Sequence, residues 1–237
     1  MEKVILNIPH ASTVVPEWAA GDLCVSAAQL DRLVRYMTDK DVDKLWDFVP
    51  AQNKQVATVS RLVVDTERYR RDEDEPMFLK GMGLYYTHTP HGTQFRTRSE
   101  ETYARCLGIY DAYHATLEEK VTRCLARHGS CVILDCHSFH DAMEYTEYDP
   151  ASFPDVCIGV NGEVGAQAQW IVDALRSAGY SVKVNEPFAG SLVPLKYWND
   201  PRVRSVMIEF NRRIYDNSSF GRVRSLCEEI YTHLCKE

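Results

Sequence analysis

The residues most suited to chemistry are two histidines, each of which follows a short apolar run. His137 belongs to the segment Asp-Cys-His-Ser at residues 135–138, directly after the apolar residues 132–134, and His10 follows the apolar residues 3–8. Short apolar runs are typical of buried strands, and open α/β folds bind ligands where such strands end. One histidine in such a turn is usually inert and hydrogen-bonded, but two with matching carboxylates favour a metal site.

Two aspartates could complete that site. Asp39 and Asp43 are four residues apart in residues 26–48, where apolar residues recur at helical spacing, so a helix would place both on one face. Zinc in hydrolytic sites usually has three protein ligands, histidine or carboxylate, and leaves a fourth position for water. His10, His137 and one of these aspartates could supply the three. The alternative is that both aspartates belong to a solvated helix face.

A further carboxylate, Glu209, lies between the apolar residues Ile208 and Phe210 in a predicted strand. Because side chains alternate along a strand, Glu209 should point away from the face of its two neighbours. A buried carboxylate is costly unless it is paired or catalytic. We expect Glu209 to act as general base toward the attacking water and then to protonate the leaving amine. An ion pair with Arg212 or Arg213 is the structural alternative.

Two arginines, Arg61 and Arg68, flank the end of another predicted strand at residues 56–65. Guanidinium groups bind carboxylates in a bidentate manner, so these arginines could hold a carboxylate substrate, although surface arginines are commoner. Residues 185–191 also follow a strand and contain the proline and glycine of a fixed loop that could approach a ligand. By itself this composition indicates only a turn.

The elements that must position these residues alternate between strands and helices. We predict strands at residues 3–8, 56–65, 132–134, 157–160, 181–184 and 205–210, and helices at residues 26–48, 99–128, 163–178 and 220–234. The first helix could be straight or kinked near residues 38–39. This alternation indicates a three-layer α/β fold, in which helices cover both faces of a mostly parallel sheet. His114 lies on the apolar face of the 99–128 helix, where a core histidine is commoner than a ligand. Residues 69–98 are expected to form a long excursion near the site.

The composition narrows the domain organisation and the partners. A chain of 237 residues with 45% hydrophobic residues is expected to form one domain over residues 1–237. The net charge of -7 argues against nucleic acid, and the apolar runs are too short to cross a membrane. The eight cysteines contain no C-x-x-C pair and are expected to be reduced. We expect a cytoplasmic protein with a small-molecule substrate; its oligomeric state is not indicated.

Six short motifs follow one another along nearly the whole chain. They are Pro9-His10-Ala11-Ser12; Thr38-Asp39 with Asp43 and Leu45; Ser60-Arg61 before Asp65 and Arg68; Asp135-Cys136-His137-Ser138; Val184-Asn185 before Phe188 and Gly190; and Glu209 before Arg212 and Tyr215. In this order they resemble the N-formylglutamate amidohydrolases, which belong with zinc carboxypeptidase-like and aspartoacylase-like hydrolases. The resemblance implies a phosphorylase/hydrolase-like fold with a central mixed sheet. It also implies hydrolysis of N-formyl-L-glutamate to formate and L-glutamate in histidine breakdown.

The resemblance also implies a role for each matching residue. The metal ligands of one zinc ion would be His10, His137 and Asp39, with Asp43 as the nearest rival of Asp39. The catalytic residues would be Glu209 and Arg61, and the substrate-binding residues would be Arg68, Asn185, Gly190 and Arg212.

Several positions depart from the family pattern. The usual Asp-Leu-Asn-Arg is Asp-Thr-Glu-Arg at residues 65–68, and the added charge of Glu67 would disfavour a dicarboxylate substrate. Lys196 also stands in a segment that matches the pattern poorly. These departures favour a second hypothesis, in which the same fold hydrolyses another N-acyl amino acid, a small peptide or a cell-wall amide. A third is a catalytically silent binding protein with structural histidines.

Overall fold

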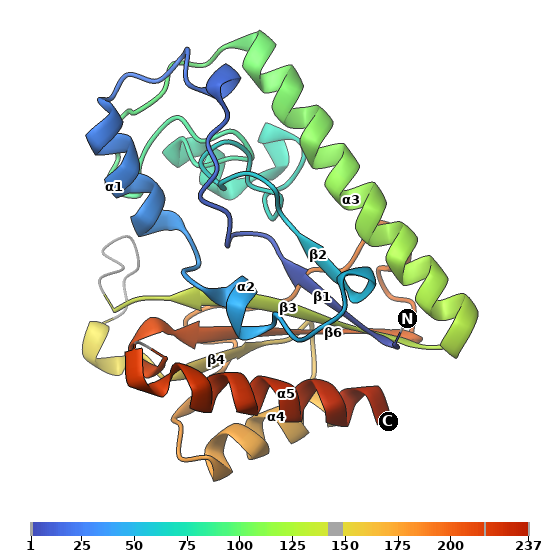
Figure 1. Cartoon of the computed structure of the whole chain (residues 1–237). Helices are drawn as coiled ribbons and strands as arrows, with labels where there is room; N and C mark the ends of the chain where they lie inside the picture. The colour runs from blue at the N-terminus through green and yellow to red at the C-terminus, as the bar shows by residue number, and fades with distance from the viewer. Residues whose placement is uncertain (1, 142–148, 216, 237) are drawn as a thin grey trace. The chain divides into compact units, whose positions relative to one another are not determined.

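Figure 1 shows a computed structural model of the chain, which describes residues 2–141, 149–215 and 217–236. Its strands form one sheet in the order β2-β1-β3-β6-β4-β5. The strands are β1 (Val4–Ile8), β2 (Lys54–Val56), β3 (Cys131–Phe139), β4 (Val156–Gly159), β5 (Val182–Val184) and β6 (Val203–Asn211). The α-helices are α1 (Ala27–Met37), α2 (Val42–Leu45), α3 (Glu100–His128), α4 (Ala166–Ser177) and α5 (Phe220–Lys236). In the described part of the chain, no helix is both long and apolar enough to span a membrane.

The sheet is mixed and mostly parallel. Strand β3 pairs in parallel with β1 on one side and with β6 on the other, and β4 pairs in parallel with β5. By contrast, β4 and β6 are antiparallel. This arrangement confirms the predicted mostly parallel mixed sheet of an α/β fold.

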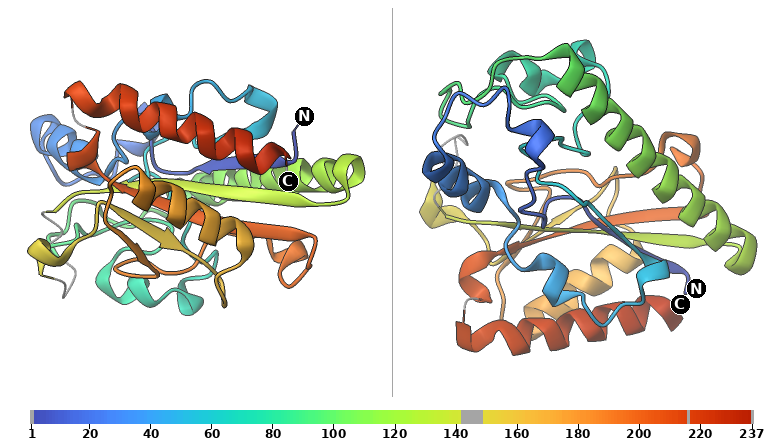
Figure 2. Two further views of the ribbon diagram at one scale, coloured as in Figure 1. Left: turned by 90° about the horizontal axis from the view of Figure 1, so that it is seen from below. Right: turned by 45° about the horizontal axis from the view of Figure 1, so that its top comes forward.

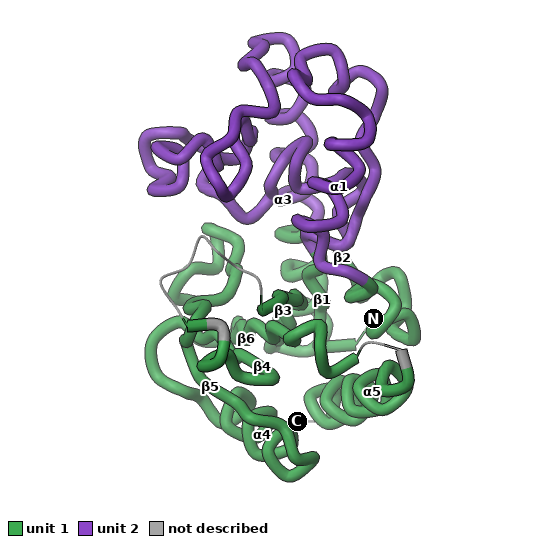
Figure 3. Tube along the Cα trace, turned by 90° about the vertical axis from the view of Figure 1, so that its left-hand side faces the viewer, with its two compact units in different colours: residues 1–8, 41–55, 117–237 green, residues 9–40, 56–116 purple. Residues whose placement is uncertain are grey.

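The chain divides into two compact units, which Figure 3 shows in different colours. Unit 1 comprises residues 1–8, 41–55 and 117–237 and contains the sheet. Unit 2 comprises residues 9–40 and 56–116 and contains α1 and the first half of α3. Each unit is built from separate stretches of sequence. The expectation of one catalytic domain over residues 1–237 remains a prediction.

Helices lie on both faces of the sheet in unit 1. On one face, Leu117 and Val121 of α3 pack against Ile5 of β1 and Ile133 of β3. Helix α5 contacts β1, and α4 contacts β4 and β5. Figures 1 and 2 show α4 and α5 on the face opposite the second half of α3. The sheet is therefore the middle layer of three, as predicted.

The face of the sheet that packs against α3 is apolar at the start of its strands and polar further along them. Residues of β3 at alternate positions share this face, so Ile133 is followed on it by Asp135 and His137. The register then places Asn7 of β1 beside Asp135 and Glu209 of β6 beside His137. Helix α3 packs on the apolar first residues of these strands, and the polar residues come later in the same strands.

Two of the predicted elements are wrong, although the other strands and helices are found within a few residues of their predicted ranges. Residues 26–48 do not form one helix, because α1 ends at Met37 and Asp41 has a left-handed backbone with φ 60°. The hydroxyl of Thr38 donates to the carbonyl of Val34 at 2.7 Å, and the N–H of Asp39 donates to His10. Side-chain bonds of this kind compete with helix continuation.

The predicted strand at residues 56–65 is a series of turns after the short β2. Its apolar residues are buried, as a strand would require, but their backbone groups bond locally. The N–H of Val63 donates to the carbonyl of Ser60, and the buried guanidinium of Arg96 donates to the carbonyl of Leu62 at 2.6 Å. These residues are buried although their side chains do not alternate between two faces as in a strand. The strand predicted from their apolar character is therefore wrong. Residues 69–98 contain only short 3-10 helices, η3 (Asp72–Asp74) and η4 (Pro76–Lys80), and isolated bridges.

Candidate active site

His10 lies two residues after β1 and is buried. Its Nε2 is 2.8 Å from Oδ1 of Asp65, whereas its Nδ1 faces Oδ2 of Asp39 at 3.7 Å and Oε2 of Glu67 at 3.9 Å. The last two distances are too long for hydrogen bonds. Two ligand atoms that share a tetrahedral zinc ion are about 3.3 Å apart, so these spacings are close to those of a metal site. The Nδ1 side of His10 therefore fits a divalent ion.

Asp65 is fully buried and fixes the orientation of His10. Its Oδ2 accepts hydrogen bonds from Nη2 of Arg61 at 2.8 Å and from the hydroxyl of Tyr86 at 2.7 Å. Burial alone would raise the pKa of Asp65, but the charges of Arg61, His10 and Arg68 outweigh burial and hold the pKa well below its ordinary value. A carboxylate behind a histidine in this way sets the ring orientation and makes the other ring nitrogen a better metal ligand.

The two arginines predicted to contact substrate both approach Asp65. Arg61 donates to it through Nε and Nη2, and Arg68 lies 3.7 Å from it while donating to the hydroxyl of Tyr86 at 3.1 Å. Burial opposes both charges, but Asp65 and Tyr86 raise the pKa of each guanidinium. Two guanidiniums therefore lie near His10 together with three carboxylates, those of Asp39, Asp65 and Glu67. The roles of these arginines in catalysis and substrate binding remain predictions.

The two candidate aspartates do not share a helix face. Asp39 is buried and lies beside His10, whereas Asp43 is exposed in α2. Because α1 ends before Asp39, the i, i+4 relation between them does not apply. The structure thus favours Asp39 over Asp43 as the neighbour of His10. Its role as the third metal ligand remains a prediction.

Within unit 2, Glu67 is a further candidate ligand, because its Oε2 lies on the Nδ1 side of His10. Sequence reasoning treated Glu67 as a charge beside the substrate and missed it as a ligand. Asp65 was also missed, although it follows the apolar residues 62–64 as Asp135 follows residues 132–134. An acid directly after an apolar run was the signal that could have drawn attention to it.

His137 has a carboxylate partner of its own in unit 1. Its Nε2 lies 3.1 Å from Oδ1 of Asp135, and that oxygen accepts a hydrogen bond from Nδ2 of Asn7 at 2.8 Å. The other oxygen of Asp135 accepts from the N–H of Leu192 at 2.9 Å. These contacts fix the aspartate, and a histidine held through Nε2 binds metal through Nδ1. Because β3 extends to Phe139, His137 lies inside the strand rather than after it.

Glu209 is the register partner of His137 in the neighbouring strand. Its side chain is 8% exposed, while Ile208 and Phe210 are buried on the other face, as alternation predicted. Cys157 of β4 is its partner on the other side. Burial raises the pKa of the Cys157 thiol to about 12, and the charge of Glu209 adds to that rise. A carboxylate therefore lies next to a candidate metal ligand on one face of the sheet.

The two arginines that follow β6 have contacts with other residues of unit 1. Arg213 forms ion pairs with Asp141 and Asp155 at 2.9 and 3.1 Å. Nε of Arg212 donates to the hydroxyl of Ser138 at 3.2 Å, next to His137 in β3. Arg212 thus lies at the end of β3 that carries His137. Its contact with substrate remains a prediction.

Asn185 and Gly190, predicted to bind substrate, contact each other. Oδ1 of Asn185 accepts from the N–H groups of Val160 at 2.8 Å and Gly190 at 3.2 Å, and its Nδ2 donates to the carbonyl of Val160. A Cβ at Gly159 would lie 2.1 Å from the carbonyl oxygen of Gly190, so only glycine fits there. The polar groups of this loop fix its own shape, and its contact with substrate remains a prediction.

The family model for N-formylglutamate amidohydrolase matches residues 2–216. An N-formylglutamate deformylase from Pseudomonas aeruginosa is 26% identical over 228 residues, which cover 90% of this chain and 81% of that protein.

Solved structures show the same fold. The crystal structure of an N-formylglutamate amidohydrolase from Ralstonia eutropha JMP134 has a TM-score of 0.81 and 23% identity, covering 99% of this chain and 93% of that one. A gene product from Agrobacterium tumefaciens has a TM-score of 0.67 and 18% identity, covering 98% of this chain and 92% of that one. The family model spans almost the whole sequence, and the chain therefore belongs to the N-formylglutamate amidohydrolase family.

Proposed function

We propose that this chain hydrolyses N-formyl-L-glutamate to formate and L-glutamate with the help of one divalent metal ion, for which zinc is the leading candidate. Family membership supports an amidohydrolase. The observation that carries the proposal is the register of β3 and β6, which sets Glu209 beside His137. A potential base next to a potential metal ligand is the arrangement that metal-assisted hydrolysis requires.

The proposed ligands are His10, Glu67 and His137. The direction of the chain supports this set: β1 runs parallel to β3 with Asn7 opposite Asp135, and His10 follows β1 as His137 follows Asp135. A divalent ion bound there would polarise a carbonyl group and lower the pKa of water. Two imidazoles and a carboxylate are a ligand set of catalytic zinc sites.

The chain's own residues then have separate tasks. Glu209 accepts a proton from the water that attacks the formyl carbonyl, and it delivers that proton to the amide nitrogen as the C–N bond breaks. Arg61 is proposed to stabilise the negative charge that develops on the carbonyl oxygen, through the Nη1 edge that takes no part in its pair with Asp65. As a ligand, Glu67 would offset the charge of the ion, which removes the argument that it repels a dicarboxylate substrate.

The test is formate release from a panel of N-formyl and N-acetyl amino acids, with protein first stripped of metal and then supplied with zinc. We expect N-formyl-L-glutamate to be among the best substrates. Glu209→Gln should lower kcat by about 10²–10⁴-fold while metal binding is retained. Activity confined to other acyl amino acids would refute the substrate, and full activity in Glu209→Gln would refute the mechanism.

A further inference from the structure

The turn of residues 65–68 carries three side chains of the candidate site without belonging to a helix or strand. The N–H of Asp65 donates to the carbonyl of Leu84 at 2.8 Å, and Oδ1 of Asp65 accepts from the N–H of Glu67 at 3.0 Å. These bonds fix the start of the turn and two of its N–H groups. The carbonyl of Asp65 accepts from the N–H of Arg68 at 3.4 Å, whereas the carbonyls of Thr66 and Arg68 are bound from outside, by α3.

Two side chains on α3 bind the carbonyls on either side of Glu67. The hydroxyl of Tyr110 donates to the carbonyl of Arg68 at 2.9 Å, and Nε2 of His114 lies 2.8 Å from the carbonyl of Thr66. The two residues are four apart and share a helix face. Their ring centroids are 4.2 Å apart, so each ring restricts the other. Glu67 is therefore flanked by two backbone groups that one rigid helix holds.

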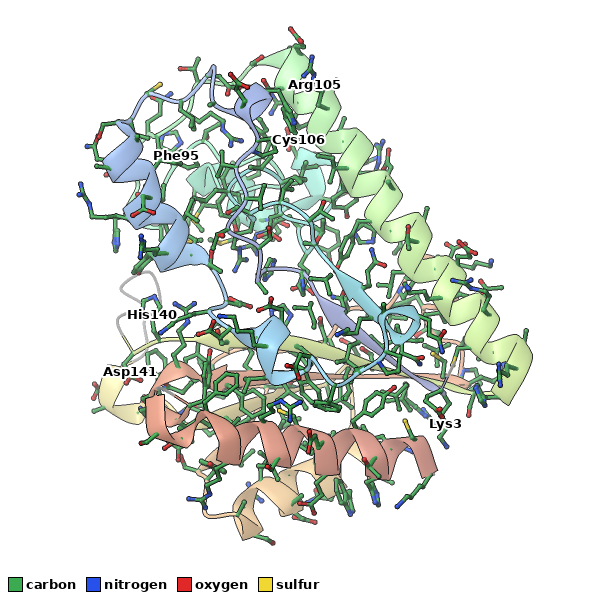
Figure 4. The ribbon with its side chains drawn as sticks, in the orientation of Figure 1. Lys3, Phe95, Arg105, Cys106, His140 and Asp141 are labelled. Carbon is green, nitrogen blue, oxygen red and sulfur yellow. The ribbon has the colours of Figure 1, made fainter. Side chains whose placement is uncertain are left out.

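The chemistry of these contacts favours firm bonds. A carbonyl oxygen only accepts, so His114 must carry its proton on Nε2. Burial lowers the pKa of His114, which keeps the ring neutral. One turn earlier on α3, Sγ of Cys106 donates to the carbonyl of Val63 at 3.2 Å, and Figure 4 shows Cys106 on the inner side of the helix. One face of α3 thus holds the whole segment from Val63 to Arg68.

We propose that Tyr110 and His114 are positioning residues for the metal site: by holding the carbonyls of Arg68 and Thr66, they fix the direction in which Glu67 points. The inference rests on the metal site of the proposed function and adds the residues that set its affinity. Without these bonds the turn gains conformational freedom, which must be lost again when an ion binds.

The experiment measures the dissociation constant for zinc by competition with a chromophoric chelator, using metal-free full-length protein. Tyr110→Phe and His114→Phe keep the rings and remove the donors. We expect each to weaken binding several-fold and the double variant to weaken it about 10–100-fold, as for other partners behind metal ligands. His114→Gln retains an N–H donor and should recover part of the affinity.

Tyr197→Phe is the matched control, because it removes a tyrosine hydroxyl that contacts Thr122 on the same helix at 2.6 Å, outside residues 65–68. Wild-type affinity is expected for this control. Circular dichroism of each variant verifies folding, which Tyr110→Phe should preserve. Wild-type affinity in the folded Tyr110→Phe and double variants, or an equal loss in the control, would overturn the inference. Failure of the wild-type protein to bind zinc would instead refute the metal site itself.

Discussion

At the scale of single residues, the two histidines share one arrangement although they come from different parts of the chain. Asp65 lies against Nε2 of His10, and Asp135 lies against Nε2 of His137. In both cases the aspartate is buried and has further hydrogen-bond donors that hold it. The repetition supports the role proposed for both rings, which is to bind a metal ion through Nδ1. The remaining question is which carboxylate, that of Glu67 or that of Asp39, completes the proposed set of ligands.

Glu67 and Asp39 both approach Nδ1 of His10, and a pair of amide variants distinguishes them. We expect Glu67→Gln to weaken zinc binding at least tenfold, because it would remove a charged ligand, and Asp39→Asn to weaken it less. Direct titration of metal-free protein with zinc measures both values. Asp43→Asn, an exposed position in α2, serves as control. A larger loss in Asp39→Asn than in Glu67→Gln would restore Asp39 as the third ligand.

Part of the candidate site could be proposed from sequence because His10, His137 and Glu209 stand in or shortly after strongly apolar strands. A polar residue in such a place is conspicuous, and the register of β3 and β6 brings His137 and Glu209 together. Glu67 could not be recognised in this way, since it belongs to a turn whose place depends on long-range bonds from α3. No local pattern reports such bonds.

At the scale of elements, regular periodicity predicted α3 and α5 well, whereas the turns at residues 57–65 were predicted as part of a strand. Their apolar residues are buried, but their backbone is held by side chains from elsewhere, above all by Arg96. This arginine is 1% exposed, donates to the carbonyls of Leu62 and Val63, and lies over the ring of Tyr85 at 4.4 Å. It replaces the hydrogen bonds that a neighbouring strand would have supplied.

We therefore expect Arg96→Met to destabilise the fold, because methionine fills similar space but leaves the carbonyl of Leu62 without this donor. The loss of the hydrogen bonds and the cation–π contact should lower the free energy of unfolding by about 2–4 kcal/mol. Urea denaturation followed by circular dichroism measures it. Arg105→Met, at an exposed position of α3 that Figure 4 labels, should change it by less than about 0.5 kcal/mol. Equal stability of both variants would show that Arg96 does not hold these turns.

At the scale of the whole molecule, folding lowers the pKa of carboxylates that join distant segments. Asp155 accepts hydrogen bonds from the N–H and hydroxyl of Ser181, just before β5, and from Arg213, just after β6. Burial would raise the pKa of Asp155, but these hydrogen bonds and the charge of Arg213 outweigh burial and lower it. Asp65 has its pKa lowered in unit 2. Each such group binds protons more weakly in the folded than in the unfolded state.

This difference fixes the sign of the pH dependence. The stabilisation from Asp155 is complete above its unfolded pKa of about 3.9 and is lost as the pH falls through the lower folded pKa. We expect Asp155→Asn to lower the free energy of unfolding by about 1–3 kcal/mol at pH 7. It should also lose less stability than wild type between pH 5 and pH 3, so that the two curves converge in acid. Urea titrations across this range measure both curves, with Asp31→Asn, from an exposed pair with Arg35, as a control that should run parallel to wild type. A constant gap between Asp155→Asn and wild type from pH 7 to pH 3 would mean that the lowered pKa of Asp155 does not contribute to stability, and that the variant acts through packing alone.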